Sequence, residues 1–507
     1  MKRTALVIMI ITLFSKILGF GRDIFLSYFF GASSISDSYL ISLTIPSVIF
    51  GFIGVGITTA YIPMQSRVID DLGDEEGSRF TSNFTNITLI IVTIIFIIGV
   101  IFTKVIVKLF ALGFSGEILS LTVNFTRISL IGMYFTALIS IFSGYLQIKS
   151  NYVVPALIGF PLNIIVIVSI YLASKGNYNI LIIGTLFGTA SQFLLMIPFI
   201  KKGNFKYILL LNIKDDKILK TFYIALPVII GTSVNQINVL VDRTLASALA
   251  VGGISSLSYA NKLSLFIQGL FVTSIVTVMY PMISTYASKK NFIGIKEKLV
   301  ESINIIIISI LPITIGSMIF TSEIIGLLFG RGAFDHSAIQ MTSSALFFYA
   351  LGMLGFGLRE VLVRVFYAIQ DTKTPMLNAA FGIVVNIILS IVLSRYIGIG
   401  GLALATSIAA MVTTALLFIN LRVKMGPLGM KQISISFLKI LFASLVMGLI
   451  AKVSFMYLTM TLNQNFSLIV AIAIGALSYF VIIYFMKIED VKVIVEVIKR
   501  KIRIGAN

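Results

Sequence analysis

Long apolar stretches separated by short polar segments recur along nearly the whole chain. About 20 consecutive apolar residues are enough for a helix to cross the hydrocarbon core of a bilayer. Stretches of this kind lie near residues 4–29, 36–64, 83–111, 118–147, 152–174, 178–200, 219–249, 253–285, 299–329, 337–369, 374–395, 400–421, 434–458 and 464–487. The pattern therefore predicts an all-α polytopic membrane protein with about fourteen transmembrane helices.

A weak internal repeat relates the first six predicted helices to the next six. Short matches recur at an offset of about 220 residues, among them Ile101–Thr103 with Ile319–Thr321 and Pro155 with Pro375. Because six is an even number of helices, the repeat is parallel, and a substrate cavity is expected between the two copies. The sequence thus predicts two six-helix lobes, two extra helices and a tail, with boundaries at 1–215, 216–426, 427–487 and 488–507.

Composition agrees with a membrane protein and argues against an enzyme. Only 12% of the residues are charged, against about 25% in soluble proteins. Cysteine is absent, which excludes disulfides, thiol catalysis and cysteine-ligated metals. The sequence also lacks paired catalytic carboxylates, metal-ligand spacings and a nucleotide-binding loop. We therefore expect a protein that is not an enzyme and needs no organic cofactor.

The formal net charge of +19 is distributed unevenly over the predicted loops. Lysine and arginine concentrate in every second loop, and the intervening loops hold only Lys175, Arg331 and Arg395. This positive-inside bias places both termini in the cytoplasm. The excess charge suits the anionic inner leaflet better than nucleic acid. Alternating apolar and basic residues from Glu489 onward predict an amphipathic helix on that leaflet.

Charged side chains inside or beside the predicted spans are the main functional signal. A charge near the bilayer centre costs about 3 kcal/mol, so a chain retains it where it faces protein or water. Cations outnumber anions in this set, and as a set facing one cavity they favour an anionic, phosphate-bearing substrate. The set is Lys16, Arg22, Asp23, Asp37, Arg127, Asp242, Arg243, Lys262, Arg359, Glu360, Arg364, Lys439 and Lys452. For each residue alone, a buried structural charge is an equally good interpretation. The charges with a gating or structural interpretation are Asp23, Arg359, Glu360 and Arg364, the last two one helical turn apart.

Polar oxygens on three predicted helices suggest a second kind of site. Asn386 and Ser390 lie one turn apart, Thr406 lies on the next helix, and Asp242 offers a carboxylate. Oxygen ligands with one carboxylate suit a hard monovalent cation. Hydrogen bonding between helices is the alternative explanation of the same residues.

Three segments resemble signatures of the MurJ (MviN) family of bacterial lipid II flippases. They are S-K-I-L-G-F-G-R-D at 15–23, F-G-A-S-S-I-S-D-S-Y at 30–39 and F-Y-A-I-Q-D-T-K-T-P at 366–375. This family belongs to the multidrug/oligosaccharidyl-lipid/polysaccharide exporter superfamily. The resemblance implies alternating access around a central cavity that binds the diphosphate and sugars of lipid II. It also implies that the last two helices form a groove for the lipid tail.

The resemblance also implies roles for individual residues. It implies substrate contacts at Lys16, Arg22, Asp37, Asn261 and Lys262, and Arg243 is a further candidate for binding phosphate. It implies Na⁺ as a coupling ion at Asp242, Asn386, Ser390 and Thr406.

The expected protein is a monomer in the bacterial cytoplasmic membrane that moves lipid II outward, driven by the membrane potential, a cation gradient or both. Another polyprenyl-linked oligosaccharide is the alternative cargo. A multidrug antiporter is less favoured, because organic cations need an acidic or aromatic pocket.

Overall fold

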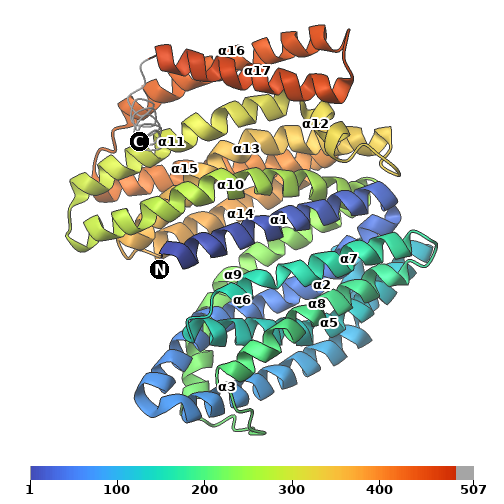
Figure 1. Ribbon diagram of the computed structural model, residues 1–507, viewed down its shortest axis with the longest axis vertical. Coiled ribbons are helices and arrows are strands. Elements are labelled where there is room, and N and C mark those ends of the chain that lie inside the picture. Colours follow the sequence, from blue (N-terminus) through green and yellow to red (C-terminus); the bar gives the residue numbers. More distant parts are fainter. Residues whose placement is uncertain (1, 487–507) are drawn as a thin grey trace. The chain divides into compact units, whose positions relative to one another are not determined.

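The computed structural model describes residues 2–486, and regular structure in that part of the chain is helical (Figure 1). The predicted tail at 488–507 lies outside the described residues. The helices are α1 (Lys2–Phe30), α2 (Ser34–Gly56), the π-helix η1 (Ile57–Tyr61), α3 (Ile62–Ile101), α4 (Thr103–Phe110), α5 (Gly116–Ile148), α6 (Val153–Leu157), α7 (Gly159–Ala173), α8 (Asn179–Lys202), α9 (Asp216–Leu249), α10 (Gly253–Ser288), α11 (Phe292–Ile319), α12 (Thr321–Leu328), α13 (His336–Ala368), α14 (Lys373–Ile397), α15 (Ile399–Met425), α16 (Met430–Leu458) and α17 (Gln464–Phe485).

The predicted all-α membrane architecture is confirmed. Each predicted apolar stretch coincides with one helix or with consecutive helices, and the stretch at 36–64 covers α2, η1 and the start of α3. Within the described residues, eleven helices are long and apolar enough to cross a membrane. The count of fourteen spans stays a prediction.

One predicted loop is instead helical. The polar segment between the second and third predicted spans belongs to α3, which begins at Ile62 and is interrupted at Gly73. Gly73 has φ 85° and ψ 177°, a conformation that glycine adopts without a steric penalty. Its neighbours, including Leu72 and Glu75, are good helix formers, so the helix continues on both sides of the break.

The described residues form two compact units. The first comprises the chain up to Ser256 together with Arg331–Ala338, and the second comprises Leu257–Gly330 and the chain from Ile339 onward. Helix α9 belongs to the first unit, where it packs against α2 and η1. The lobe boundaries expected at 215 and 426 stay predictions.

Local geometry supports the internal repeat. Helices α4 and α12 have 8 residues each and both follow a phenylalanine. The turns after α5 and α13 also match: Ser150 and Gln370 have φ of 60° and 61°. The next amides, of Asn151 and Asp371, donate to carbonyls five residues earlier at 2.8 and 2.9 Å. Two stretches 220 residues apart thus adopt the same turn, as expected for copies of one unit.

A proline in α2 breaks the helical hydrogen-bond ladder, and a neighbouring helix repairs it. Pro46 has no N–H, so the carbonyl of Ser42 loses its partner in the helix. The Ser129 hydroxyl on α5 donates to that carbonyl at 2.6 Å. Such repair is needed because the bilayer core offers no water to an unpaired backbone group.

The second unit repeats this arrangement on α11. Pro312 frees the carbonyl of Ile308, and the Tyr479 hydroxyl on α17 donates to it at 2.7 Å. Tyr479 is buried. The hydrogen bond therefore fixes the C-terminal helix pair to α11.

Replacing Tyr479 with phenylalanine is expected to lower the free energy of unfolding by about 1 kcal/mol, because the Ile308 carbonyl is left buried and unpaired. Thermal unfolding of the purified protein in detergent, followed by circular dichroism, measures the change. Tyr484, exposed on the same helix, supplies the control Y484F. Equal melting temperatures for Y479F and Y484F would show that the bond contributes nothing to stability.

Candidate functional site

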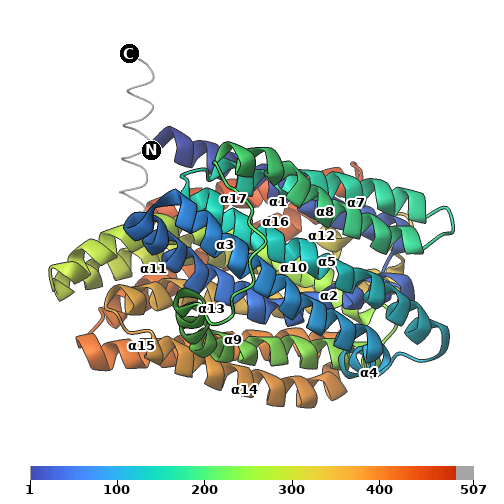
Figure 2. The same cartoon turned by 90° about the horizontal axis from the view of Figure 1, so that it is seen from below.

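Small residues position α1 against α7. A Cβ atom added at Gly159 would lie 2.0 Å from the Ser15 hydroxyl, so the helices approach closely there. The Asn163 side chain lies beside Gly19 and donates to the Gly159 carbonyl at 2.8 Å. Figure 2 shows α1, α7 and α8 running side by side. Part of the motif at 15–23 therefore serves packing, which sets the position of the charges on the same helix.

The charged pair on α1 combines a buried anion with an accessible cation. Arg22 Nη2 lies 3.2 Å from Asp23 Oδ1, and the two side chains are 27% and 8% exposed. A guanidinium has five N–H donors, so an arginine paired with one carboxylate oxygen can also bind an oxyanion. Lys16 is exposed, about 9 Å from Arg22 along the helix axis. Helix α1 thus presents two accessible cations.

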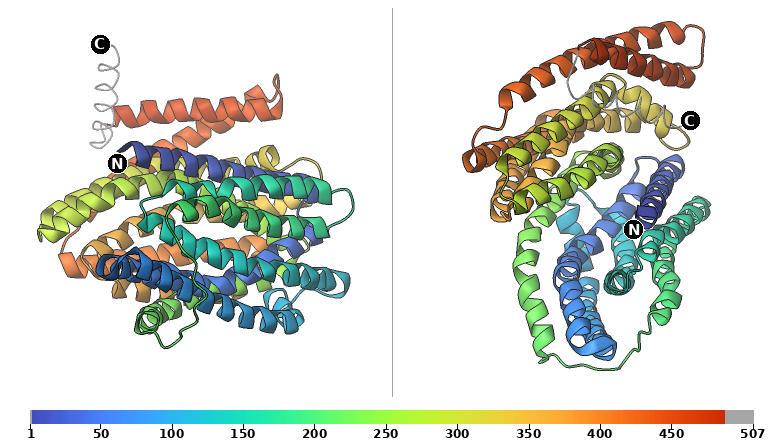
Figure 3. Two further views of the ribbon diagram at one scale, coloured as in Figure 1. Left: turned by 60° about the horizontal axis from the view of Figure 1, so that its bottom comes forward. Right: turned by 60° about the vertical axis from the view of Figure 1, so that its left-hand side comes forward.

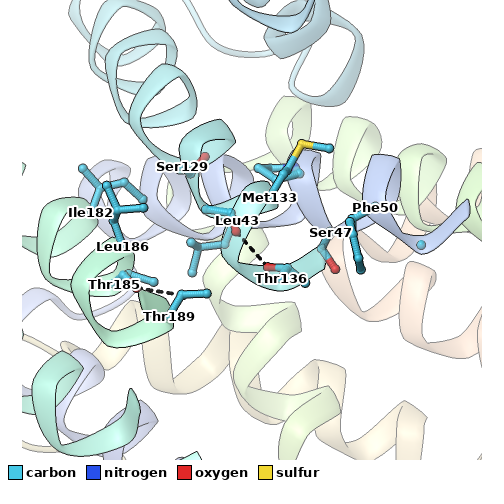
Figure 4. Close-up of a pocket in the computed structure, with 13 residues that line it drawn as sticks. Leu43, Ser47, Phe50, Ser129, Met133, Thr136, Ile182, Thr185, Leu186 and Thr189 are labelled. Carbon is cyan, nitrogen blue, oxygen red and sulfur yellow. Dashed lines mark hydrogen bonds between the residues drawn. The ribbon is translucent and has the colours of Figure 1, made fainter. Parts of the chain in front are cut away.

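A polar contact connects this region to α8. Tyr39 on α2 interacts electrostatically with both Arg22 and Asp23, and its buried hydroxyl lies 2.7 Å from Thr185 Oγ1. Thr185 lines a cavity of about 350 Å³ between α2, α5 and α8 (Figure 4). The cavity is lined by Leu43, Pro46, Ser47, Phe50, Gly51, Ser129, Gly132, Met133, Thr136, Ile182, Thr185, Leu186 and Thr189. Its walls are neutral and partly hydroxylated.

The hydroxyl groups of this cavity are better acceptors than donors. Ser129 donates to the Ser42 carbonyl at 2.6 Å. Thr136 donates to the Gly132 carbonyl at 3.0 Å and Thr189 to the Thr185 carbonyl at 2.9 Å (Figure 4). Because these hydroxyls donate their protons to backbone carbonyls, their oxygens offer lone pairs to a ligand. The cavity therefore suits an uncharged group with hydroxyl or amide donors.

Asp37 is placed as a helix cap. Its carboxylate accepts hydrogen bonds from the Gly252 amide at 2.8 Å, the Ser255 amide at 2.8 Å and the Ser255 hydroxyl at 2.7 Å, and the residue is 1% exposed. These donors lie at the start of α10, where amide groups have no helical partner. In this structure Asp37 thus fixes the start of α2 to the start of α10. Its contact with substrate stays a prediction.

Arg243 and two glycines lie near the contact between Asp37 and the start of α10. Arg243 on α9 donates to the Ile254 carbonyl at 3.2 Å and interacts electrostatically with Asp37. Gly252 has φ 78°, and a Cβ atom there would lie 2.2 Å from the Ala32 carbonyl oxygen. Gly31 likewise has φ 61° and would place a Cβ atom 2.2 Å from the Ala333 carbonyl oxygen. Glycine at both positions lets three chain segments meet backbone to backbone. The sequence offered no clear signal of this contact.

The predicted charges of the second unit lie on α10 and α13. Asn261 and Lys262 on α10 are partly buried. The Arg359 guanidinium lies 5.3 Å from the centre of the Phe356 ring, and that of Arg364 lies 5.6 Å from the Tyr280 ring. Glu360 is exposed. Stacking on aromatic rings stabilises a cation in apolar surroundings, which fits the structural interpretation of the two arginines.

Three of the four predicted cation ligands form one hydrogen-bonded group. Asn386 Nδ2 donates to Thr406 Oγ1 at 3.2 Å, and Ser390 Oγ donates to Asn386 Oδ1 at 2.9 Å. Asp242 belongs to the first unit, where Asn238 Nδ2 lies 3.5 Å from its carboxylate. The contacts between α14 and α15 agree with interhelical hydrogen bonding. The Na⁺ site stays a prediction.

The motif at 366–375 contains a second capping carboxylate, which lies in a loop. Asp371 accepts from the Thr374 amide at 3.0 Å and forms an ion pair with Lys424 at the end of α15. Burial of the Asp371 carboxyl opposes its ionisation, but the hydrogen bonds from Lys424 and Thr374 outweigh burial and lower its pKa to about 2. The pair joins the turn before α14 to the end of α15.

This pKa predicts acid sensitivity in a defined window. The folded protein holds Asp371 ionised below the ordinary value of 3.8, so the carboxylate stabilises the fold fully above pH 3.8. That stabilisation is lost as the pH falls from about 4 to about 2. Melting temperatures in detergent should fall over this window, and the fall should be smaller in D371N. A D371N protein with the wild-type pH profile would exclude Asp371 as a contributor.

Comparison with known proteins identifies the family. The family model described as "Lipid II flippase MurJ" matches residues 26–483. The probable lipid II flippase MurJ of Buchnera aphidicola subsp. Baizongia pistaciae is 31% identical over 418 residues, covering 81% of both chains. The lipid II flippase MurJ of Thermosipho africanus is 30% identical over 473 residues, covering 93% of this chain and 94% of that one.

Solved structures agree with this assignment. A structure of lipid II flippase MurJ in an inward closed conformation has a TM-score of 0.81 and 29% identity, over 95% of this chain and 98% of that chain. An inward-facing multidrug transporter of the MATE family has a TM-score of 0.71 over 84% of this chain and 98% of that chain. Its identity of 14% shows a shared fold alone. The protein described here belongs to the MurJ lipid II flippase family.

Proposed function

We propose that this protein flips lipid II, the lipid-linked peptidoglycan precursor, from the cytoplasmic to the outer leaflet of the bacterial cytoplasmic membrane. It belongs to a family of flippases, so its task is transport and not a chemical reaction. The observation that best supports this cargo is the accessible Arg22 beside the buried Asp23 on α1. In our proposal the protein acts as a monomer with both termini in the cytoplasm.

Arg22 and Lys16 bind the diphosphate in this mechanism. A guanidinium can form two parallel hydrogen bonds to a phosphate group, and an ammonium adds a point charge. Asp23 keeps part of the Arg22 charge compensated when no cargo is bound. Lys262 and Arg243 are further candidates for contacts with the headgroup.

The neutral cavity of the first unit accepts an uncharged part of the headgroup. Its wall combines hydroxyl acceptors such as Thr136 and Thr189 with apolar side chains such as Met133. Sugar hydroxyls and amide N–H groups are the donors that such a wall would bind. The lipid tail stays in the bilayer while the two lobes alternate between inward and outward opening.

The driving force comes from outside the chain. An inside-negative potential favours outward movement of an anionic headgroup by about 2.3 kcal/mol per charge per 100 mV. A cation gradient that resets the empty carrier is compatible with the oxygens of Asn386, Ser390 and Thr406, to which Asp242 would add a carboxylate.

Competition for binding distinguishes the possible cargoes. The purified protein is titrated with lipid II bearing a short prenyl chain, and then challenged with a different polyprenyl diphosphate oligosaccharide or with an organic cation. We expect lipid II to bind and the organic cation not to displace it. Stronger binding of the other oligosaccharide would assign that cargo instead, and displacement by the organic cation would favour a multidrug antiporter.

A further inference from the structure

The segment that connects α8 to α9 is held on the surface of the first unit. Figure 3 shows it crossing beside α3 on its way from the end of α8 to the start of α9. Residues 206–213 form no helix or strand and are named the strap here. The basic character of residues 201–217 by itself indicates only a linker between the predicted lobes.

Side chains of α3 bind the backbone of the strap. Ser82 Oγ accepts from the Ile208 amide at 3.1 Å, and Asn86 Nδ2 donates to the Leu210 carbonyl at 2.8 Å. At the end of the strap, Asn83 exchanges two hydrogen bonds with the backbone of Asn212, at 2.8 and 2.9 Å. Alternate strap residues are therefore fixed to α3 through their own backbone groups.

The intervening residues expose apolar side chains. Leu209, Leu211 and Ile213 are 88%, 55% and 59% exposed. Leu209 and Leu211 alternate with the residues whose backbone groups α3 binds, so their side chains lie on the exposed side of the strap, and Ile213 is exposed in the turn that follows. Tyr207 differs from them, because its hydroxyl donates to Asn86 Oδ1 on α3 at 2.7 Å. Leu209, Leu211 and Ile213 are named the apolar row here. A row of this kind on a rigidly held backbone indicates that something apolar covers it.

The lysines around the strap and its position on α3 indicate which partner covers the apolar side chains. Between residues 201 and 220 there are six lysines and two aspartates, and Lys206 and Lys214 at either end of the row are exposed. The α3 residues that bind the strap lie where its polar first half gives way to the apolar stretch after Asn86. Aliphatic groups flanked by cations, next to the start of an apolar span, are typical of a segment at a membrane surface.

We propose that the strap is a binding element for the anionic lipids of the inner leaflet. Leu209, Leu211 and Ile213 enter the acyl-chain region, and the flanking lysines bind the negatively charged headgroups. This goes beyond cargo transport and rests on the topology of the proposed function, which puts this end of α3 on the cytoplasmic side. It assigns the linker between α8 and α9 a role in binding lipid at the cytoplasmic surface of the membrane.

The absence of tryptophan from the chain allows a direct test. The full-length L209W protein is reconstituted into vesicles of phosphatidylcholine with phosphatidylglycerol, with bromine on the acyl chains as a fluorescence quencher. We expect an about twofold loss of emission relative to unbrominated vesicles of the same composition. L211W repeats the measurement at a second position in case L209W does not fold. L72W is the matched control, because Leu72 is 55% exposed but lies in the acidic turn of α3.

The lysines are tested in the same vesicles. Adding K206Q and K214Q to L209W should weaken the quenching in vesicles with phosphatidylglycerol and leave it unchanged in phosphatidylcholine alone. Quenching of L209W and L211W no stronger than that of L72W would overturn the proposal and point to a protein partner. Equal quenching with and without phosphatidylglycerol would overturn the role of the anionic headgroups. None of these readouts involves transport, so a negative result leaves the flippase proposal standing.

Discussion

Replacing Arg22 with alanine is expected to reduce the affinity for lipid II by about tenfold or more, because charge-assisted hydrogen bonds contribute about 1.5–3 kcal/mol each. Flipping should be lost with it, since the cation on α1 is the group that recognises the diphosphate. The protein should still insert, because the packing of α1 on α7 depends on Gly159 and Asn163 and not on this side chain. Binding of short-chain lipid II to the purified variant measures the effect.

Two further variants separate phosphate binding from loss of the ion pair. R22K keeps the charge without the planar fork of donors and should retain part of the affinity. R22A/D23N also removes the buried carboxylate, and it should remain as weak as R22A if the missing phosphate contact is the cause. Recovery of binding in the double variant would mean that an uncompensated Asp23 had disturbed the site. Arg395 is exposed in the last turn of α14, so R395A controls for a general loss of positive charge.

Replacing Asp37 with alanine is expected to lower the free energy of unfolding by about 3 kcal/mol. One buried carboxylate accepts three hydrogen bonds there, and each buried donor left unpaired costs about 1 kcal/mol or more. Amide hydrogen exchange at the start of α10 should accelerate, because these amides have no other helical partner. Thermal unfolding in detergent gives the total effect, and exchange measured by mass spectrometry locates it.

The matched control is an ordinary exposed cap. Asp335 accepts from the Ala338 amide at 2.7 Å and is exposed, so D335A should cost only about 1 kcal/mol. A D37A protein as stable as D335A would contradict the structural role assigned to Asp37. If D37A kept its stability but lost lipid II binding, the substrate contact implied by the family resemblance would be the better interpretation.

The features that sequence predicted well are those that depend on local pattern. Apolar stretches predicted the helices because the bilayer imposes a minimum length on each span. The charges of Arg22 and Asp23 stood out because such residues are costly inside a membrane. Short sequence matches predict the repeat at an offset of about 220 residues. The matching geometry of the turns at Ser150 and Gln370 agrees with that prediction.

Features that depend on distant contacts could not be predicted in this way. The family resemblance implies a substrate contact for Asp37, but the local sequence does not indicate its hydrogen-bond partners, which lie 215 and 218 residues away at the start of another helix. The pairing of the strap with α3 cannot be predicted from the sequence, because it uses the side chains of Ser82 and Asn83, which follow no periodic pattern. The hydropathy pattern also does not predict the helix break at Gly73, because the segment is polar on both sides of it.

The most direct test of the account is the amount of lipid II exposed at the outer surface of a bacterium depleted of its own flippases and supplied with this chain. Wild type and R22A are compared at equal levels in the membrane. We predict that the wild-type chain restores exposure and that R22A does not. A well-inserted wild-type protein that exposes no lipid II would contradict the proposed cargo, and full exposure by R22A would contradict the role of Arg22.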